Sequence, residues 1–269
     1  MRTRAWRPGP FLGIQLALHG AALLQLVMVP QEWPWAATTV LLSQLMLMAA
    51  GLWPRSTCLG ANLIRLPAAA VQRSEVAITI DDGPDPQVTP QVLAILAKNN
   101  AVVTFFCIGE RAAAHPELCR SIVAAGHRIE NHGAHHPMLC SLSGPKGWRR
   151  EVHGGQRILQ QITGQHPYFY RAVAGLRNIF LDPILHSSGL HLASWTRRGF
   201  DTQERDPEKV FQRLTHQLAA GDILLLHDGN AARTLADEAV IVSVLPRLLH
   251  TIHHRGLIPV TLAHACNLP

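Results

Sequence analysis

Two adjacent carboxylates follow a short apolar run in the chain. The run Val76–Ile80 is rich in β-branched residues, which predicts a buried strand. Asp81 and Asp82 close it, and Gly83-Pro84 forms a turn that ends it. The carboxyl end of a strand is where α/β folds build their sites, and two like charges side by side need a cation or a proton between them. The pair therefore predicts metal or acid–base chemistry, with a plain Asp-Asp-Gly turn as the alternative.

A histidine cluster follows a second strand-like segment, Arg128–Asn131. His132 and His136 lie four residues apart, so one turn of backbone can bring both rings to one ion, with Asp82 as the third ligand. Imidazole is a common ligand of zinc-like metals, and three protein ligands with an open position are typical of catalytic sites. The chain has 16 histidines, so a chance cluster is the alternative, but the strand-end acids favour metal binding.

Alternating strand-like and helix-like segments must position these side chains. Helices are predicted from Thr89-Pro90, from Asp206-Pro207 with Asp206 as N-cap and Gly221 just past the end, and over Glu238–His254. Strands that alternate with helices predict a parallel sheet, open or closed. The predicted strands are Val76–Ile80, Val103–Gly109, Arg128–Asn131, Phe169–Val173, Leu190–Trp195, Ile223–Leu226 and Ile258–Leu262.

These segments resemble the polysaccharide deacetylases of carbohydrate esterase family 4, the homology domain of the nodulation-factor deacetylase. The family's five motifs occur in order over roughly residues 75–264. They match Thr79–Pro84 (Thr-Phe-Asp-Asp-Gly-Pro in the family), His132–His136 (His-Ser/Thr-x-x-His), Arg171–Gly175 (Arg-x-Pro-x-Gly), Trp195–Asp201 (an Asp after a strand) and Ile223–His227 (a strand ending in Leu-x-His). The resemblance implies an α/β fold closed into a distorted (β/α) barrel of about seven parallel strands.

The resemblance also implies a metal centre. Asp82, His132 and His136 would be the ligands of one divalent ion, with Zn²⁺ expected. A divalent ion in such a site lowers the pKa of its water towards neutrality and polarises an amide carbonyl.

The acid and the base of the reaction are likewise implied by the resemblance. Asp81 would be the general base, paired with Arg171, and His227 the general acid, oriented and charged by Asp201. An acid and a base with separate partners keep distinct pKa values, so that one site can run both half-reactions near pH 7. Backbone N–H groups near Ala174 would stabilise the oxyanion.

The sequence departs from the family's pattern at several positions. Gly133 replaces the Ser or Thr of the second motif, so a hydroxyl that would brace the loop is missing. Val173 replaces the proline of the third motif, Ala174 replaces a residue that is often aromatic, and Thr202 stands where the family often has Trp. None of these changes removes a ligand or a proton-transfer group, so they bear on substrate choice.

The N-terminal part of the chain is apolar in two long stretches. Phe11–Val29 and Trp35–Trp53 each cover about 28 Å as helices, close to the bilayer core of about 30 Å. The short connection Pro30–Pro34 carries a Trp, which is typical of membrane interfaces. We predict a membrane hairpin over 1–60 with spans at about 11–29 and 35–53, a linker over 61–74 and a catalytic domain over 75–269. A signal peptide and two soluble core helices are the alternatives.

The distribution of arginines predicts the orientation of the hairpin in the membrane. Arginines flank both outer ends of the hairpin, and its loop has no Lys or Arg: Arg2, Arg4 and Arg7 precede the first span, and Arg55, Arg65 and Arg73 follow the second. The positive-inside rule then places both termini and the catalytic domain in the cytoplasm, at a bacterial-type inner membrane.

Composition supports this placement and bears on the partners. The five cysteines, an odd number without metal-type spacing, indicate reduced thiols and fit a cytosolic domain. The net charge of +6 favours an anionic membrane surface. Because no basic run with interleaved aromatics occurs, nucleic acid is not predicted as a partner.

Together these features predict a metal-dependent hydrolase that removes N-acetyl groups from an N-acetylated amino sugar in a glycan or lipid-linked saccharide. A deformylase of a lipid-linked aminosugar is a close alternative, and a catalytically silent carbohydrate-binding module is the alternative from another class. A silent module has no chemical need for the intact set Asp81, Asp82, His132, His136 and His227, so the set favours the enzyme.

Overall fold

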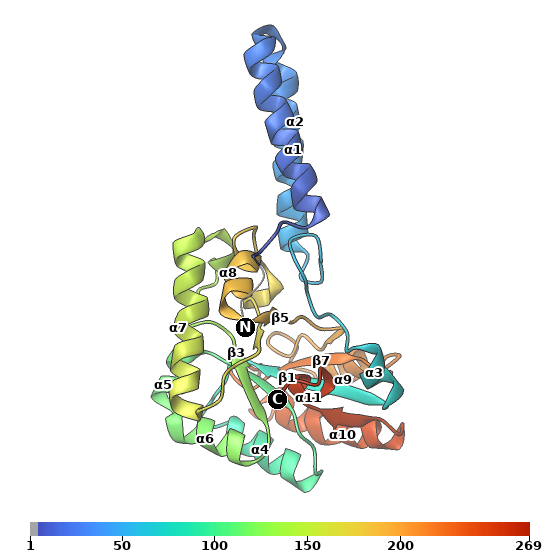
Figure 1. Ribbon diagram of the computed structural model, residues 1–269. Coiled ribbons are helices and arrows are strands. Elements are labelled where there is room, and N and C mark those ends of the chain that lie inside the picture. Colours follow the sequence, from blue (N-terminus) through green and yellow to red (C-terminus); the bar gives the residue numbers. More distant parts are fainter. Residues whose placement is uncertain (1–4) are drawn as a thin grey trace.

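Parallel strands form one curved sheet in the computed structural model, which describes residues 5–269 (Figure 1). Arg2 and Arg4, which contribute to the predicted charge asymmetry, lie outside the described residues. The strand order is β5-β4-β3-β2-β1-β7-β6, and β8 pairs with the start of β1. The strands are β1 Glu75–Asp81, β2 Thr104–Cys107, β3 Arg128–Asn131, β4 Phe169–Tyr170, β5 His191–Leu192, β6 Arg197–Arg198, β7 Ile223–His227 and β8 Ile258–Val260.

The two edges of this sheet are consecutive in the chain. β5 and β6 are joined by residues 193–196 alone, so the sheet must curve until its edges approach each other. The predicted α/β barrel of about seven parallel strands is therefore confirmed.

The alternation of side chains along β1 places the acids inside the barrel. Val76, Ile78 and Ile80 belong to the core between the sheet and the outer helices, whereas Ala77 packs in the barrel interior. Because successive side chains of a strand point to opposite faces, Thr79 and Asp81 share the inner face with Ala77. The helices around the sheet are α3 Ala68–Gln72, α4 Thr89–Lys98, α5 Gly109–Ala114, α6 Pro116–Ala124, α7 Pro145–Thr163, α8 Leu181–Ser188, α9 Pro207–Thr215, α10 Val240–His254 and α11 Leu262–Ala265.

Several element ends differ from the sequence prediction. Asp206 caps α9 as predicted by accepting a hydrogen bond from Glu208 N, but α9 ends at Thr215, well before Gly221. Gly221, at φ +87°, instead donates its N–H to the carbonyl of Glu75, next to β1. The left-handed turn that glycine allows is thus used for the approach to the sheet rather than for ending the helix.

Four predicted strands are shorter than expected, and Val103–Gly109 and Ile258–Leu262 are reduced to β2 and β8. In the segment predicted as Leu190–Trp195 only His191–Leu192 form a strand, β5. Thr196 N then donates to the carbonyl of Ile223, and β6 begins beside β7 at Arg197, beyond the predicted segment. The segment predicted as Phe169–Val173 stops at Tyr170, and residues Val173–Gly175 form the 3-10 turn η3, in which Ala174 has φ +52°. Contacts with distant parts of the chain thus outweighed the local preference of these segments for strand structure.

The N-terminal hairpin projects from the barrel as a stalk (Figure 1). It consists of α1 Pro10–Met28, the 3-10 turn η1 Pro30–Glu32 and α2 Trp33–Leu52. Both helices are long and apolar enough to span a membrane, as a signal sequence also is. Most of their large apolar side chains are exposed, whereas a core helix of a soluble protein buries them.

Polar residues of the hairpin face each other. Ser43 Oγ donates to Gln15 Oε1 over 2.5 Å, and Gln44 Nε2 lies 3.1 Å from His19 Nε2. Gln15 and His19 interrupt the apolar stretch of α1, and both are paired with α2. Gln15 and Ser43 are buried between the two helices, whereas the His19–Gln44 contact is exposed.

Residues after α2 attach the hairpin to the barrel. Leu63 N donates to the carbonyl of Leu192, and Ser194 N donates to the carbonyl of Leu63, so residue 63 lies beside β5. Arg177 N, in the loop after η3, donates to the carbonyl of Gly51 over 3.1 Å. The base of the hairpin is therefore bonded to the loops at the carboxyl ends of β4 and β5.

Candidate active site

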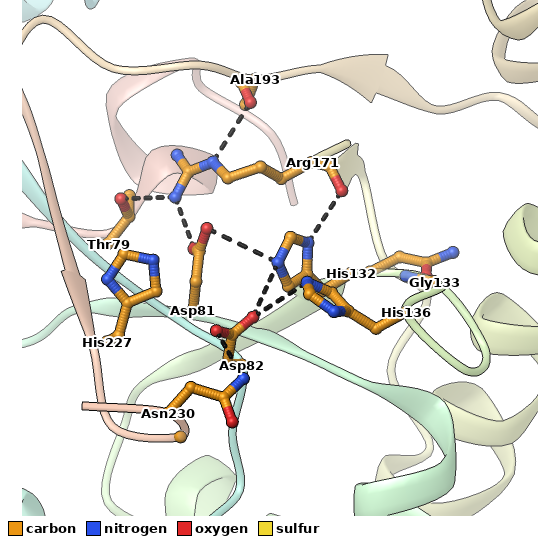
Figure 2. A network of polar contacts seen from close by, with 12 residues as sticks. Thr79, Asp81, Asp82, His132, Gly133, His136, Arg171, Ala193, His227 and Asn230 are labelled. Atoms are coloured by element: carbon orange, nitrogen blue, oxygen red, sulfur yellow. Dashed lines mark hydrogen bonds and ion pairs between the residues drawn. The ribbon is translucent and has the colours of Figure 1, made fainter. Parts of the chain in front are cut away.

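The predicted polar residues lie at the carboxyl edge of the sheet. Asp81 ends β1, His227 ends the neighbouring β7, and the two are paired in register. His132 follows β3, and Arg171 follows β4. Because the carboxyl ends of parallel strands meet at one edge, residues far apart in sequence converge here (Figure 2).

Asp82, His132 and His136 form the tightest cluster. The Nε2 atoms of both histidines lie 3.1 Å from Asp82 Oδ1, and one potential ligand atom from each residue falls within 4.8 Å of the others. Asp82 adopts φ +71° and His136 φ +56°, so the left-handed backbone at both positions turns the side chains inward. The structure thus brings all three predicted ligands together.

The donor atoms of this cluster suit a divalent cation. His132 Nδ1 lies 2.8 Å from the carbonyl of Arg171, which only accepts, so Nδ1 carries the proton and Nε2 of the neutral ring presents a lone pair. The buried Asp82 Oδ1 finds no well-aligned hydrogen-bond partner within residues 5–269. Two imidazole nitrogens and one carboxylate oxygen converging on one point are a ligand set of zinc sites.

The electrostatics of the cluster favour a positive charge beside Asp82. Burial opposes ionisation of Asp82, but the imidazole groups of His132 and His136, each 3.1 Å from its Oδ1, hold its pKa well below the usual range. Burial likewise lowers the pKa of His132, and the carboxylates of Asp81 and Asp82 raise it by more. The buried carboxylate therefore requires a positive charge beside it, which a proton or a metal ion can supply.

Arg171 fixes Asp81 from inside the barrel. Its Nη1 donates to Asp81 Oδ1 over 2.6 Å and to Thr79 Oγ1 over 2.7 Å, and its other nitrogens donate to the carbonyls of Ala193 and Ser194. All of the guanidinium is buried. Asp81 Oδ2 is left facing His132, 3.7 Å from its Nε2. One oxygen of Asp81 is thus held by Arg171, and the other points towards the ligand cluster.

His227 and Asp201 form a buried pair on the other side. His227 Nδ1 lies 2.9 Å from Asp201 Oδ1, and His227 N donates to Asp201 Oδ2 over 2.7 Å. Burial lowers the pKa of His227, but the Asp201 carboxylate outweighs it, and the pKa rises from 6.5 to about 9. Figure 2 shows His227 across the Asp81–Asp82 pair from His132 and His136.

Two supporting residues were not predicted from the sequence. Asn230 Nδ2 donates to Asp82 Oδ2 over 3.0 Å, and Arg111 donates to the carbonyl of Asp82 over 2.7 Å and to Asn230 Oδ1 over 2.9 Å. Together they orient the Asp82 carboxylate so that Oδ1 faces the histidines. Asn230 was detectable because it follows the strand-end run His227-Asp228-Gly229, whereas no local pattern marks Arg111.

Asp228 is a further buried carboxylate beside the site. Thr89 Oγ1 donates to its Oδ2 over 2.5 Å, and Gly229 N donates to its Oδ1. Burial raises its pKa to about 7. These bonds connect the end of β7 to the start of α4, and Asp228 lies against Gly83, where any side chain would collide with the carboxylate.

Glu151 of α7 braces the loop that carries His136. Its Oε2 accepts hydrogen bonds from the N–H groups of Ala134, His135 and His136. Gly133 has φ +91°, and a Cβ there would lie 3.1 Å from Glu151 Oε2. The loop therefore has a carboxylate brace from α7, and the backbone at Gly133 favours glycine.

Comparison with known proteins places the chain among carbohydrate deacetylases. Residues 68–193 match the family model of polysaccharide deacetylases. A chitooligosaccharide deacetylase of Sinorhizobium fredii is 31% identical over 201 residues, covering 72% of this chain and 92% of that protein. A peptidoglycan-N-acetylglucosamine deacetylase of Bacillus cereus is 32% identical over 175 residues, covering 64% of this chain and 81% of that protein.

Solved structures share the fold. A family 4 carbohydrate esterase from Streptomyces lividans, solved with acetate, is 28% identical with a TM-score of 0.62, over 69% of this chain and 91% of that one. A family 4 pseudoenzyme from Bacillus anthracis is 19% identical with a TM-score of 0.68, over 77% and 69%. Because a pseudoenzyme has this fold, activity must be argued from the site residues.

Proposed function

Because this chain belongs to the polysaccharide deacetylase family, we propose that it is a metal-dependent N-deacetylase of an N-acetylated amino sugar in a glycan or a lipid-linked saccharide. Asp82, His132 and His136 hold one divalent ion, Zn²⁺ by the character of the donors. The observation that carries the proposal is the buried Asp82 Oδ1 with an imidazole nitrogen of each histidine 3.1 Å away.

Asp81 acts as the general base. The ion, when bound, polarises the amide carbonyl and makes water a nucleophile near neutral pH. Arg171 occupies Asp81 Oδ1, so Oδ2, on the side of His132, receives the proton of the attacking water. The buried guanidinium also balances the charge of Asp81 beside the carboxylate of Asp82.

His227 acts as the general acid. With a pKa of about 9 it holds its proton at neutral pH, and its Nε2 is the nitrogen not bonded to Asp201. Nε2 therefore gives its proton to the leaving amine while Asp201 stabilises the imidazolium. The oxyanion is stabilised by backbone N–H groups of η3, since the first N–H groups of a helical turn have no partner within it.

We further propose that the chain is anchored in a bacterial-type inner membrane by residues 1–60. Residues 61–74 connect the anchor to the catalytic domain of residues 75–269, which faces the cytoplasm. The exposed apolar surfaces of α1 and α2 and the arginines beyond the two outer ends of the hairpin support this arrangement. A glycan carried on a lipid is then a natural substrate.

Hydrolysis by purified full-length protein tests the function. We expect release of acetate from N-acetylglucosamine oligomers, peptidoglycan fragments or an N-acetylated lipid-linked amino sugar, abolished by a chelator and restored by Zn²⁺. The Asp81→Asn variant is the control for contaminating esterases. Release of formate from N-formylated analogues instead of acetate would favour the deformylase. Tight glycan binding without release of either acid would favour the silent module.

A further inference from the structure

Two loops at the site expose large apolar side chains. The loop after His136 carries Met138, Leu139 and Leu142, which are 75%, 71% and 77% exposed. The loop between η3 and α8 carries Ile179 and Phe180, both more than a third exposed. We name these five residues the apolar lip. Leaving this much apolar surface in water is unfavourable, so a cluster of this kind marks an interaction site.

Hydrogen bonds connect the two loops that carry the apolar lip. Asn178 Nδ2 donates to the carbonyls of Ser141 and Ser143 over 2.8 Å each, and Trp148 Nε1 donates to Asn178 Oδ1 over 2.9 Å. Cys140 and Trp148 are buried directly beneath. These bonds tie the two loops together, so their apolar side chains form one surface.

The lip is continuous with the base of the hairpin. Arg177, two residues before Ile179, donates its backbone N–H to the carbonyl of Gly51 and its Nη2 to the carbonyl of Ser56. Gly175 lies against Pro54, where a Cβ would come within 2.5 Å of the proline. In Figure 1 the start of α8 lies at the end of the barrel from which the hairpin projects. The lip therefore lies on the side of the domain that faces a membrane spanned by the hairpin.

Basic residues accompany the lip. Lys146, Arg149 and Arg150 are exposed on the first turns of α7, directly after the lip loop. Residues 137–150 contain no Asp or Glu. Apolar side chains next to exposed cations are the combination by which a protein surface binds the headgroup region of an anionic bilayer.

We propose that the apolar lip inserts into the headgroup region of an anionic bilayer and holds the mouth of the site at the membrane surface. His136 precedes the lip loop, and Arg171 precedes the second loop, so both lip segments begin at the site. Such seating favours an amino sugar presented by a lipid over a long free glycan. The inference rests on the proposed membrane anchor, but its test does not depend on hydrolysis.

Fluorescence quenching in nanodiscs tests the seating. The full chain is reconstituted with phosphatidylcholine and phosphatidylglycerol, using lipids that carry a nitroxide near the headgroup or near the chain end. Leu142→Trp adds a fluorophore at the lip. Ile258→Trp adds the control on β8, which pairs with the start of β1 at the end of the strands away from the site. We expect the headgroup nitroxide to quench the added lip fluorescence by about half, at an interfacial depth of about 5–10 Å, and to leave the control unquenched.

Two further variants sharpen the result. Leu139→Trp repeats the measurement on a second exposed side chain. Lys146→Glu/Arg149→Glu/Arg150→Glu should reduce the quenching of the lip fluorophore, as should high salt or the removal of phosphatidylglycerol. Equal quenching of the two lip variants and of the Ile258→Trp control, by either nitroxide, would overturn the proposal, whatever the protein hydrolyses.

Discussion

Replacing Asp201 by asparagine separates the charge of the His227–Asp201 pair from its shape. Asp201 holds the pKa of His227 at about 9 against the effect of burial, which lowers it. Asparagine keeps the size of the side chain but removes the charge, while His227 stays buried. Asp81 and Asp82 also raise the pKa of His227, by less than Asp201 does, and a cation bound at Asp82 offsets their charges. We therefore expect the pKa of His227 in the metal-bound variant to fall to its ordinary value of 6.5 or below.

The expected loss of activity follows from the protonated fraction of His227. At pH 8 this fraction is about 0.9 for a pKa of about 9 and about 0.03 for a pKa of 6.5, so kcat should fall by up to about 30-fold, and by less where the bound cation also lowers the pKa of His227 in the wild type. In the variant, kcat should decline as the pH rises through about 6.5, and in the wild type at a higher pH, of at most about 9. Below about pH 6.5 both proteins keep His227 protonated, so the ratio of wild-type kcat to variant kcat becomes smaller.

The same pKa shift makes a prediction for stability. Because the pKa of His227 is raised on folding, the shift stabilises the metal-free protein fully below pH 6.5, and this contribution is lost as the pH rises through about 9. The difference corresponds to about 3 kcal/mol. Denaturant titrations of wild type and Asp201→Asn should therefore differ most at low pH and converge at high pH.

The decisive assay is the pH profile of kcat on a confirmed substrate, with metal content measured in each preparation. Asp206→Asn is the matched control, because Asp206 caps α9 away from the site and asparagine is an equally good cap. An NMR titration of His227 in the metal-free protein checks the pKa directly. An unchanged alkaline limb in Asp201→Asn, at full kcat, would refute the role of His227 as an acid charged by Asp201.

Further variants address the ligands, the proton-transfer groups and the orientation. His132→Ala/His136→Ala should lose the metal by elemental analysis, while His135→Ala keeps it; full occupancy in the double variant would exclude these ligands. Asp81→Asn and His227→Ala should each keep the metal but lose hydrolysis by about 10²-fold or more, and near wild-type acetate release from either would exclude its role. A C-terminal fusion to green fluorescent protein should fluoresce, and one to alkaline phosphatase should be inactive, because the arginines lie outside the hairpin loop; the reverse pattern would place the domain on the other side.

The residues at the carboxyl edge of the sheet could be predicted from the sequence because the sequence signals for them are local. A β-branched run that ends in charged residues specifies both a buried strand and the point where it emerges, and parallel strands emerge at a common edge. This is why Asp81, His132 and His227, each read from its own segment, lie together in the structure. The fold was thereby predicted, whereas the catalytic roles remain proposals.

Features that depend on distant contacts were not accessible in the same way. β6 consists of two arginines and exists because they pair with Leu224 and Leu225 of the neighbouring β7, which is distant in the sequence. Arg111 reaches Asp82 from α5, where nothing in its neighbourhood distinguishes it from a surface arginine. The partners of these residues are far away in the sequence, so a local sequence pattern does not encode the contacts.

Gly133 illustrates how a departure from a family motif is interpreted differently once the contacts are known. On sequence alone, its lack of a hydroxyl indicated a loop without its brace. In the structure, a serine side chain at φ +91° would be strained and would crowd Glu151 Oε2, the oxygen that accepts three N–H groups of the loop. A buried carboxylate with three such donors orients the loop more firmly than a single hydroxyl, because bonds to a charged acceptor are the stronger ones. The substitution and Glu151 are therefore best understood as one arrangement that holds His136 towards Asp82.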